Sequence, residues 1–217
     1  MTCSSENQGP PPPTAAGRLA GCEVLLIVTG GIAAYKACTL VSRLVQRGAG
    51  VTVAMTRAAT RLVGPATFQS LSGRRVLTSL WTAERDCDAQ HIHVTERADA
   101  VVVAPATANL LGKLAGGIAD DLCSTLLASI GPSPEQGGTP VLLAPSMNSR
   151  MWASPFVQAN VTRLRQAGCA IIGPEEGWMA CRTFGIGRMS EPETILEHVE
   201  RQLLRTRPKA AKLRNMG

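Results

Sequence analysis

Runs of consecutive aliphatic residues alternate with amphipathic segments along most of the chain. The first run, EVLLIVT at 23–29, ends at two glycines and is followed by a segment of helical periodicity at 32–46. Three later runs have the same character, and they stand at 51–55, 100–105 and 140–145. Strands that are apolar over their whole length are typical of a parallel sheet covered by helices on both faces.

Segments with helical periodicity fill the gaps between these runs, at 65–72, 107–115, 120–129, 155–167 and 192–204. The alternation predicts an α/β fold, a doubly wound parallel sheet in a flavodoxin-like or Rossmann-like three-layer sandwich. In such folds ligands bind outside the carboxyl ends of the strands. The loops to search are therefore 29–33, 55–57, 104–109 and 144–148.

The pattern also predicts the domain organisation. A single domain at 21–205 is expected to follow a disordered leader at 1–20, which contains four consecutive prolines, and to precede a basic flexible tail at 206–217. With 217 residues and 45% hydrophobic content, the chain is long enough for one substantial core. The stretch 173–191 has no clear period and carries five Gly and Pro residues, which predicts a long functional loop and a candidate lid.

Composition narrows the function classes. Only 3% of the residues are aromatic, which disfavours a nucleic-acid binder that stacks bases, while the formal net charge of +6 suits anionic ligands such as phosphate esters. No apolar run is long enough to span a membrane, and the leader lacks the apolar segment of a secretory signal. The seven cysteines have neither a CxxC pair nor metal-ligand spacing, which predicts a reducing cytoplasm and no metal site.

Gly30, Gly31 and Ile32 connect the first strand to its helix, where free backbone N–H groups and the helix dipole favour a phosphate. The fingerprint of three spaced glycines is absent, so a mononucleotide phosphate is favoured over a dinucleotide, and a plain tight turn is the alternative. Thr56 ends the second strand. Its hydroxyl is expected either to contact the same phosphate or to cap the next helix.

Small and amide side chains follow the two later strands. Ala106, Thr107 and Asn109 leave room for a flat ring beside the backbone, although Thr107 or Asn109 capping the following helix explains them equally well. Asn148 lies in the segment PSMNSRMW at 145–152, just past a strand end. A neutral amide there is able to donate hydrogen bonds to a carboxylate without cancelling its charge.

Two further side chains are candidates for chemistry. His91 precedes the buried strand at 100–105, and a role for it as a lone histidine needs outside support. Cys181 lies in the polar stretch 173–191, whereas Cys38 and Cys123 fall on apolar helical faces. Cys181 is therefore the cysteine most suited to act as an acid or a nucleophile.

Five segments between about 23 and 202 together resemble the flavin-containing cysteine decarboxylases, and above all the branch that acts on 4'-phosphopantothenoylcysteine. They are TGGIAAYKA, MTRAATRLVGPATFQSLSG, HIHVTERADAVVVAPATANLLGKLAGGIADDL, PSMNSRMW and EEGWMACRTFGIGRMSEP, in this order. The resemblance implies FMN as the cofactor. Its phosphate would be bound by Gly30, Gly31, Ile32 and Thr56, and its isoalloxazine ring would be lined by Ala106, Thr107 and Asn109.

The resemblance also implies the catalytic and substrate-binding residues. The catalytic residues would be His91, Asn148 and Cys181, and the substrate would be bound by Asn148, Met151, Ala180 and Arg182. Arg182 stands where the family usually has Gly, so its effect on the predicted lid is open. Family members assemble as homotrimers, sometimes arranged into homododecamers, with FMN at the subunit interface.

The implied activity is decarboxylation of 4'-phosphopantothenoylcysteine to 4'-phosphopantetheine in coenzyme A biosynthesis, in the cytoplasm. The thiol would be oxidised to a thioaldehyde, CO2 would leave, and the resulting enethiol would be reduced again with Cys181 as proton donor. The ligase activity of the bifunctional bacterial relatives is not expected in this chain. Two alternatives stay open: a peptidyl-cysteine decarboxylase that releases the enethiol, and a non-catalytic FMN-binding regulatory subunit.

Overall fold

The computed structural model describes residues 17–80, 90–130 and 138–205, without the side chains of 90–92. A five-stranded parallel sheet forms the centre, with the strand order β2-β1-β3-β4-β5. Its strands are β1 (Glu23–Val28), β2 (Gly50–Met55), β3 (Ala100–Ala106), β4 (Val141–Pro145) and β5 (Ala170–Ile171). The predicted doubly wound parallel sheet is therefore confirmed, in the flavodoxin-like order.

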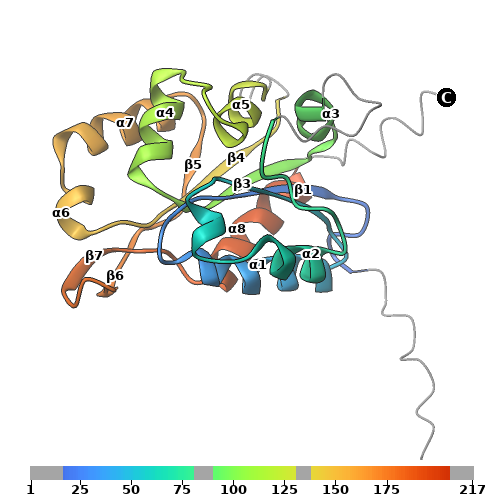
Figure 1. Cartoon of the computed structure of the whole chain (residues 1–217), viewed down its shortest axis with the longest axis horizontal. Coiled ribbons are helices and arrows are strands. Elements are labelled where there is room, and N and C mark those ends of the chain that lie inside the picture. Colours follow the sequence, from blue (N-terminus) through green and yellow to red (C-terminus); the bar gives the residue numbers. More distant parts are fainter. Residues whose placement is uncertain (1–16, 81–89, 131–137, 206–217) are drawn as a thin grey trace, which may run out of the picture.

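Helices cover both faces of the sheet (Figure 1). One layer consists of α1 (Ala34–Gln46), α2 (Pro65–Ser72) and α8 (Pro192–Arg205). The other consists of α3 (Gln90–Arg97), α4 (Ala108–Gly116), α5 (Leu122–Ala128) and α7 (Pro155–Gln166). Because side chains alternate along a strand, β1 supplies both layers: Leu26 is buried in the first hydrophobic cluster and Ile27 in the second.

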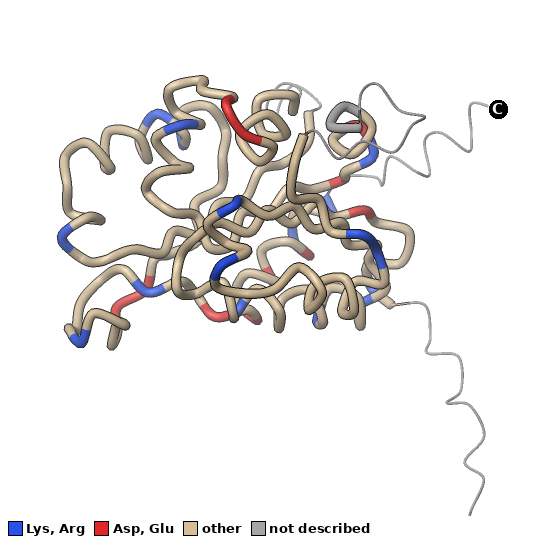
Figure 2. Tube along the Cα trace, viewed as in Figure 1, with Lys and Arg blue, Asp and Glu red and all other residues tan. Residues whose placement is uncertain are grey.

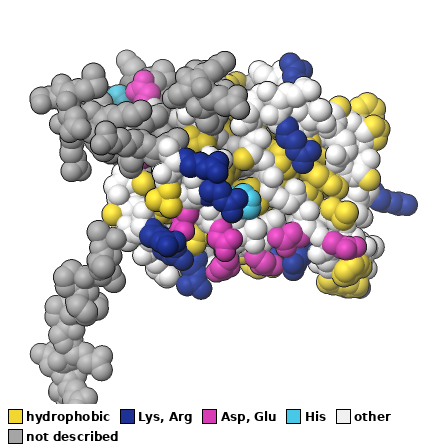
Figure 3. Space-filling view, turned by 180° about the vertical axis from the view of Figure 1, so that it is seen from behind, with side chains coloured by type: hydrophobic (Ala, Val, Ile, Leu, Met, Phe, Trp, Pro, Cys, Tyr) yellow, Lys and Arg dark blue, Asp and Glu magenta, His cyan; other side chains and the backbone are white. Residues whose placement is uncertain are grey.

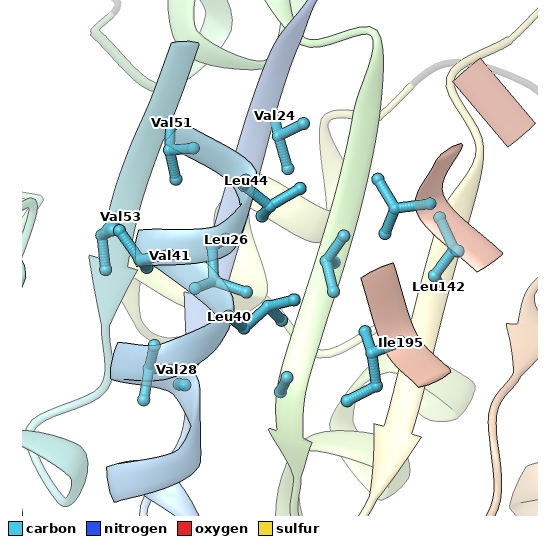
Figure 4. Packing of buried hydrophobic residues seen from close by; sticks show 14 of the residues in the cluster. Val24, Leu26, Val28, Leu40, Val41, Leu44, Val51, Val53, Leu142 and Ile195 are labelled. Atoms are coloured by element: carbon cyan, nitrogen blue, oxygen red, sulfur yellow. The ribbon is translucent and has the colours of Figure 1, made fainter. Parts of the chain in front are cut away.

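The first cluster is close-packed between α1, α8 and the sheet (Figure 4). Leu40 and Leu44 of α1 lie over Leu26, and Ile195 of α8 lies beside Leu142 of β4. Each is fully buried, and full burial of such a side chain stabilises a fold by roughly 1.5–3 kcal/mol. This packing explains why the apolar runs and helical periods were readable from the sequence.

The stretch 173–191 is not an irregular loop, so that prediction was wrong. It contains an antiparallel hairpin of β6 (Glu175–Trp178) and β7 (Phe184–Arg188). Three glycines, Gly177, Gly185 and Gly187, occupy positions where side chains would otherwise reveal the two-residue period. The hairpin projects from one end of the molecule, near the short helix α6 (Ser149–Trp152) (Figure 1).

The folded part begins before residue 21, where the predicted leader was expected to end. Leu19 is fully buried, and its N–H donates to the Arg47 carbonyl at 2.9 Å. The Arg18 Nη1 atom lies 3.6 Å from the Glu200 Oε2 atom of α8. Residues 17–20 therefore pack with the domain, while 1–16 and the predicted tail at 206–217 lie outside the described residues. Within the described ranges, no helix is long and apolar enough to cross a membrane.

Candidate functional site

A cavity of about 570 Å³ lies at the carboxyl ends of β1, β3 and β4. Its lining comes from segments 30–36, 107–109, 146–151, 178–181 and 187–189. The strand β2 lies on one side of β1 and the strand β3 lies on the other, so the order in which strands are added to the sheet reverses between β1 and β3. This is the topological switch point at which doubly wound folds bind ligands.

The loop from β1 to α1 forms one wall of the cavity. A Cβ on Gly30 would lie 2.4 Å from the Ala58 Cβ, so only glycine allows the loop to approach β2 this closely. The N-cap of α1 is Ala33, which offers no side-chain hydrogen bond, and the first turn holds no acidic residue. The Ala34 and Lys36 N–H groups donate to the carbonyls of Gly31 and Ala33, both at 2.9 Å, but no side chain compensates the positive end of the helix dipole, which suits a phosphate.

A second wall follows β3. The Thr29 hydroxyl donates to the Pro105 carbonyl at 2.6 Å and accepts the Thr107 N–H at 3.2 Å, which joins the loops after β1 and β3. Thr107 also caps α4, since its hydroxyl accepts the Leu110 N–H at 3.5 Å. Thr107 and the exposed Asn109 both line the cavity, so Thr107 is a helix cap and also a lining residue, and its contact with a flavin ring stays a prediction.

Two residues predicted to contact the cofactor do not line the cavity in this structure. Ala106 is fully buried in β3, and its carbonyl accepts the Ser146 N–H at 3.1 Å. The Thr56 hydroxyl accepts the Ala59 N–H at 3.2 Å, at the start of the short helix η1 (Ala59–Arg61), whose N-cap is Ala58. The other predicted cofactor residues, Gly30, Gly31, Ile32, Thr107 and Asn109, lie together in the lining.

Asn148 is the N-cap of α6, and its two amide atoms have different partners. The Oδ1 atom accepts the Arg150 N–H at 2.8 Å, a bond that only the oxygen is able to make. The Nδ2 group is thereby directed at the Cys181 Sγ, 3.2 Å away. The structure therefore brings together two predicted catalytic residues that are 33 positions apart.

Cys181 lies at the tip of the hairpin between β6 and β7, in the middle of a loop of residues 180–182 that Met179 and Thr183 enclose. The Arg182 N–H donates to the Met179 carbonyl at 2.9 Å, and the Met179 N–H donates to the Thr183 carbonyl at 3.0 Å. Arg182, the last residue of the loop, has a φ of 60°, a conformation that favours glycine. This explains why glycine is usual there in the resembling family. Arg182 itself is exposed and does not line the cavity, whereas Ala180 and Met151 do.

Thr183 is a further candidate residue that the sequence did not single out. Its hydroxyl lies 3.0 Å from the Cys181 Sγ. The hydrogen bond from Thr183, followed by those from Asn148 and the backbone, outweighs desolvation and holds the pKa of the Cys181 thiol below its ordinary value. Burial instead raises the pKa of Cys123. Cys181 therefore forms a thiolate more readily than Cys123, which belongs to the core.

His91 lies in α3, but its side chain is outside the described residues. Figure 1 places α3 at the opposite end of the molecule from the hairpin that carries Cys181. One chain therefore does not bring the backbone of α3 to the cavity, and the predicted role of His91 stays a prediction.

A family model described as Flavoprotein matches residues 14–204. The chain belongs to the Flavoprotein family. Over 179 residues it is 48% identical to the coenzyme A biosynthesis bifunctional protein CoaBC of Bacillus subtilis. The aligned region covers 82% of this chain and 42% of that relative. The chain spans about two fifths of the length of the curated relatives that it matches.

Solved structures of related flavoproteins share the fold. A mutant PPC decarboxylase complexed with pantothenoylaminoethenethiol matches with a TM-score of 0.73 and 27% identity, over 85% of this chain and 99% of that chain. The FMN binding protein AtHal3 matches with a TM-score of 0.72 and 27% identity, over 86% and 98% respectively. The flavodoxin-like three-layer arrangement is thus common to this flavoprotein and both structures.

Two cations of this flavoprotein line the cavity near the base of the hairpin, and the sequence pattern did not single them out. Lys36 of α1 donates to the Glu191 Oε1 at 2.9 Å. Arg188 of β7 contacts the same Glu191 at 3.2 Å and Glu175 of β6 at 3.2 Å. Basic and acidic positions lie near one another at this end of the molecule (Figure 2). The network ties the hairpin to the first turn of α1.

The outer face of the hairpin is apolar. Trp178 pairs with Phe184 across the two strands, and Ile186 lies on the same side two residues further along. All three are exposed, Trp178 at 65% and Phe184 at 68%. Hydrophobic side chains gather over this end of the molecule, at the lower right of Figure 3. An exposed apolar cluster of this kind is typical of an interaction surface.

Proposed function

We propose that this flavoprotein binds FMN and converts 4'-phosphopantothenoylcysteine to 4'-phosphopantetheine in coenzyme A biosynthesis. The observation that carries the proposal is the contact between Asn148 and Cys181 on the wall of the cavity that also contains the uncapped end of α1. The names of the relatives support it, since one is a coenzyme A biosynthesis protein and another a PPC decarboxylase with a bound enethiol.

The residues of the cavity fit FMN. Its volume of about 570 Å³ lies within the range of about 300–1,000 Å³ that is usual for cofactor sites. The amide groups at the start of α1 would hold the phosphate. Gly31, Thr107 and Ala108 offer a lining of small side chains beside which the flavin ring would lie.

Asn148 would hold the substrate carboxylate. A bound flavin supplies a two-electron acceptor for the thiol-bearing carbon and later returns the electrons. The carboxylate must keep its negative charge until CO2 leaves, and the neutral Nδ2 group of Asn148 donates hydrogen bonds without neutralising that charge. Because Oδ1 is already occupied by the Arg150 N–H, the donor end of the amide stays turned toward the cavity side.

Cys181 would complete the reaction by donating a proton to the carbon that has lost CO2. Its lowered pKa makes the thiol a better acid, and the Thr183 hydroxyl and the Asn148 amide both lie within hydrogen-bond distance of the thiolate that remains. Cys181 is exposed and lines the cavity, so its proton is recovered from solvent.

We further propose a homo-oligomer, either a trimer or a dodecamer built from trimers, in which His91 of one chain completes the site of another. Two observations support this arrangement: α3 lies at the far end of the molecule from the cavity (Figure 1), and exposed apolar side chains surround the cavity on Ile32, Tyr35 and Trp178. We place the protein in the reducing cytoplasm, because the cysteines that the structure describes are all free.

The decisive experiment is mass analysis of the products formed from 4'-phosphopantothenoylcysteine by the FMN-loaded protein. We expect CO2 and the saturated thiol 4'-phosphopantetheine. Accumulation of the enethiol by the unaltered protein would place it with the peptidyl-cysteine decarboxylases. Binding of substrate with no CO2 release would identify a regulatory subunit, and either result would overturn the proposal.

Cys181→Ser separates the two halves of the reaction. We expect the variant to oxidise and decarboxylate the substrate and then to accumulate the enethiol, because the proton donor of the last step is missing. Cys38→Ser, a cysteine of α1 outside the cavity lining, serves as the matched control and should give the saturated thiol. Normal formation of the saturated thiol by Cys181→Ser would refute the role of Cys181.

A further inference from the structure

Lys36 and Arg188 are the charged side chains in the described lining of the cavity, and both are cations. Their carboxylate partners, Glu175 and Glu191, lie behind them and do not line it. A ligand in the cavity therefore meets the positive side of this network. Lys36 is also largely buried, with 13% of its side chain exposed, so its charge is poorly screened by solvent.

Arg188 carries an unpaired donor. The Nη groups contact Glu175 and Glu191, but the Nε atom is buried and has no hydrogen-bond partner among the described residues. The guanidinium lies against the backbone of β6, since a Cβ on Gly177 would lie 3.0 Å from Nε. A buried donor of a charged group without an acceptor is unfavourable, so the free protein does not satisfy Arg188 by itself.

We infer that Lys36 and Arg188 form a subsite for a phosphate monoester, and that it receives the phosphate of the substrate. The ammonium of Lys36 keeps two N–H groups beyond the one given to Glu191, and a modest rotation of the Arg188 guanidinium toward the cavity gives Nε an anionic acceptor. Glu175 and Glu191 hold the two cations in place. This inference rests on the proposed function, because it assigns a binding site to the phosphate end of the same substrate.

The position of the subsite suits a long substrate. Cys181 and Asn148 mark the reacting end at the hairpin tip, and Arg188 lies at the other end of β7. β7 extends about 13 Å from Phe184 to Arg188 at the usual rise per residue of a strand. An extended pantothenoyl arm is of the same order of length. The cysteine carboxylate and the phosphate are therefore able to occupy the two ends of one cavity.

The test compares 4'-phosphopantothenoylcysteine with pantothenoylcysteine, which differs only in the phosphate, on the FMN-loaded protein. We expect the wild type to prefer the phosphorylated substrate. Arg188→Gln and Lys36→Gln should each lower the ratio of kcat/KM for the phosphorylated substrate to kcat/KM for pantothenoylcysteine by about 10- to 100-fold. Arg188→Lys, which keeps the charge but not Nε, should retain part of the preference.

The matched control is Arg43→Gln, which removes a cation of α1 that pairs with exposed Glu193 outside the cavity. Its preference for the phosphorylated substrate should equal that of the wild type. Equal loss on both substrates in Arg188→Gln and Lys36→Gln, or an unchanged preference, would overturn the subsite. Circular dichroism and FMN content of each variant show whether it is folded and loaded.

A binding measurement keeps the inference separate from the proposed reaction. Isothermal titration of the FMN-loaded protein with 4'-phosphopantothenate and pantothenate should show tighter binding of the phosphorylated compound, lost in Arg188→Gln even if no CO2 is ever released. A parallel titration of flavin-free protein with FMN and with riboflavin, which lacks the phosphate, tests whether the two cations bind the phosphate of FMN instead. If the variants lose discrimination between FMN and riboflavin instead, the assignment to the substrate phosphate is wrong.

Discussion

At the residue scale, the chemistry of the site depends on three side chains that share hydrogen bonds. Asn148 caps α6 with its oxygen and donates to the Cys181 sulfur with its nitrogen. Thr183 lies on the other side of the sulfur at 3.0 Å. Two donors at one sulfur stabilise the thiolate, which is why the pKa of Cys181 is lowered although desolvation opposes it.

Thr183→Val should raise the pKa of Cys181, because the largest of the interactions that lower it is lost. With the pKa raised, less thiolate is present at neutral pH and the midpoint of thiolate formation moves to higher pH. The measurement is the rate of iodoacetamide alkylation of Cys181 as a function of pH, with Cys181→Ser as background. Thr183→Ser keeps the hydroxyl and should keep the wild-type profile. An unchanged profile in Thr183→Val contradicts the assignment.

Asn148→Asp separates the two functions of Asn148. A carboxylate still accepts the Arg150 N–H, so the cap of α6 persists and the free energy of unfolding should change by less than about 1 kcal/mol. The negative charge repels the substrate carboxylate, and kcat/KM should fall at least about 100-fold. Denaturant unfolding and steady-state kinetics provide the two readouts. A variant that retains activity would show that Asn148 does not hold the carboxylate.

At the scale of elements, the hairpin is positioned by the absence of side chains on its inner face. The Met147 N–H donates to the Gly187 carbonyl at 3.0 Å, which holds β7 against the loop that carries Asn148. A Cβ on Gly187 would lie 2.2 Å from the Met147 carbonyl oxygen. Gly187 therefore sets the distance between Cys181 on the hairpin and Asn148 on the loop.

Gly187→Ala should destabilise the protein by about 1–3 kcal/mol or displace the hairpin, since a backbone carbonyl has little room to move. The rate of formation of the saturated thiol should also fall, because displacement of the hairpin moves Cys181 away from Asn148. The control is Gly112→Ala in α4, where the new Cβ would lie 3.5 Å from the Asn160 Nδ2, an ordinary contact. The free energy of unfolding of that variant should rise by about 0.5–1 kcal/mol, as measured by thermal or denaturant unfolding. Equal stability of the two variants would contradict this account.

At the scale of the whole molecule, the doubly wound sheet gathers the loops after β1, β3 and β4 at one end and leaves α3 at the other (Figure 1). A parallel sheet forces this division, because all its strands end on the same side. Residues just before a strand, such as His91 before β3, fall at the amino side of the sheet. A site that uses both ends therefore needs a second copy of the chain.

Co-expression of His91→Ala with Cys181→Ser tests this conclusion. Neither variant alone should yield the saturated thiol. If His91 and Cys181 of one site come from different chains, random assembly at equal amounts should restore about a quarter of the sites. The measurement is the rate of 4'-phosphopantetheine formation by the purified mixed oligomer. No restoration would mean that one chain supplies both residues.

Much of the site was predictable where local sequence carries the signal. Gly30 and Gly31 follow an apolar run and precede a helical period, so a phosphate loop was expected there. Thr183 and Arg188 carried no local signal. Arg188 reaches Glu175 across the hairpin, and Lys36 reaches Glu191 over 155 positions of sequence. Contacts of this kind depend on how elements pack, and periodicity does not describe them.

The sequence by itself determined the layered architecture, because strand and helix periods and apolar runs are local properties that burial on both faces of a sheet requires. It also determined which loops would meet at the carboxyl end of the sheet. Only the tertiary structure decided how those loops combine: that the glycine-rich stretch pairs as a hairpin, that its tip brings Cys181 to Asn148 at 3.2 Å, and that its base adds Arg188 to the cavity that Lys36 of α1 also lines. The physical reason is that these contacts join side chains distant in the chain, and their geometry follows from packing and backbone hydrogen bonds.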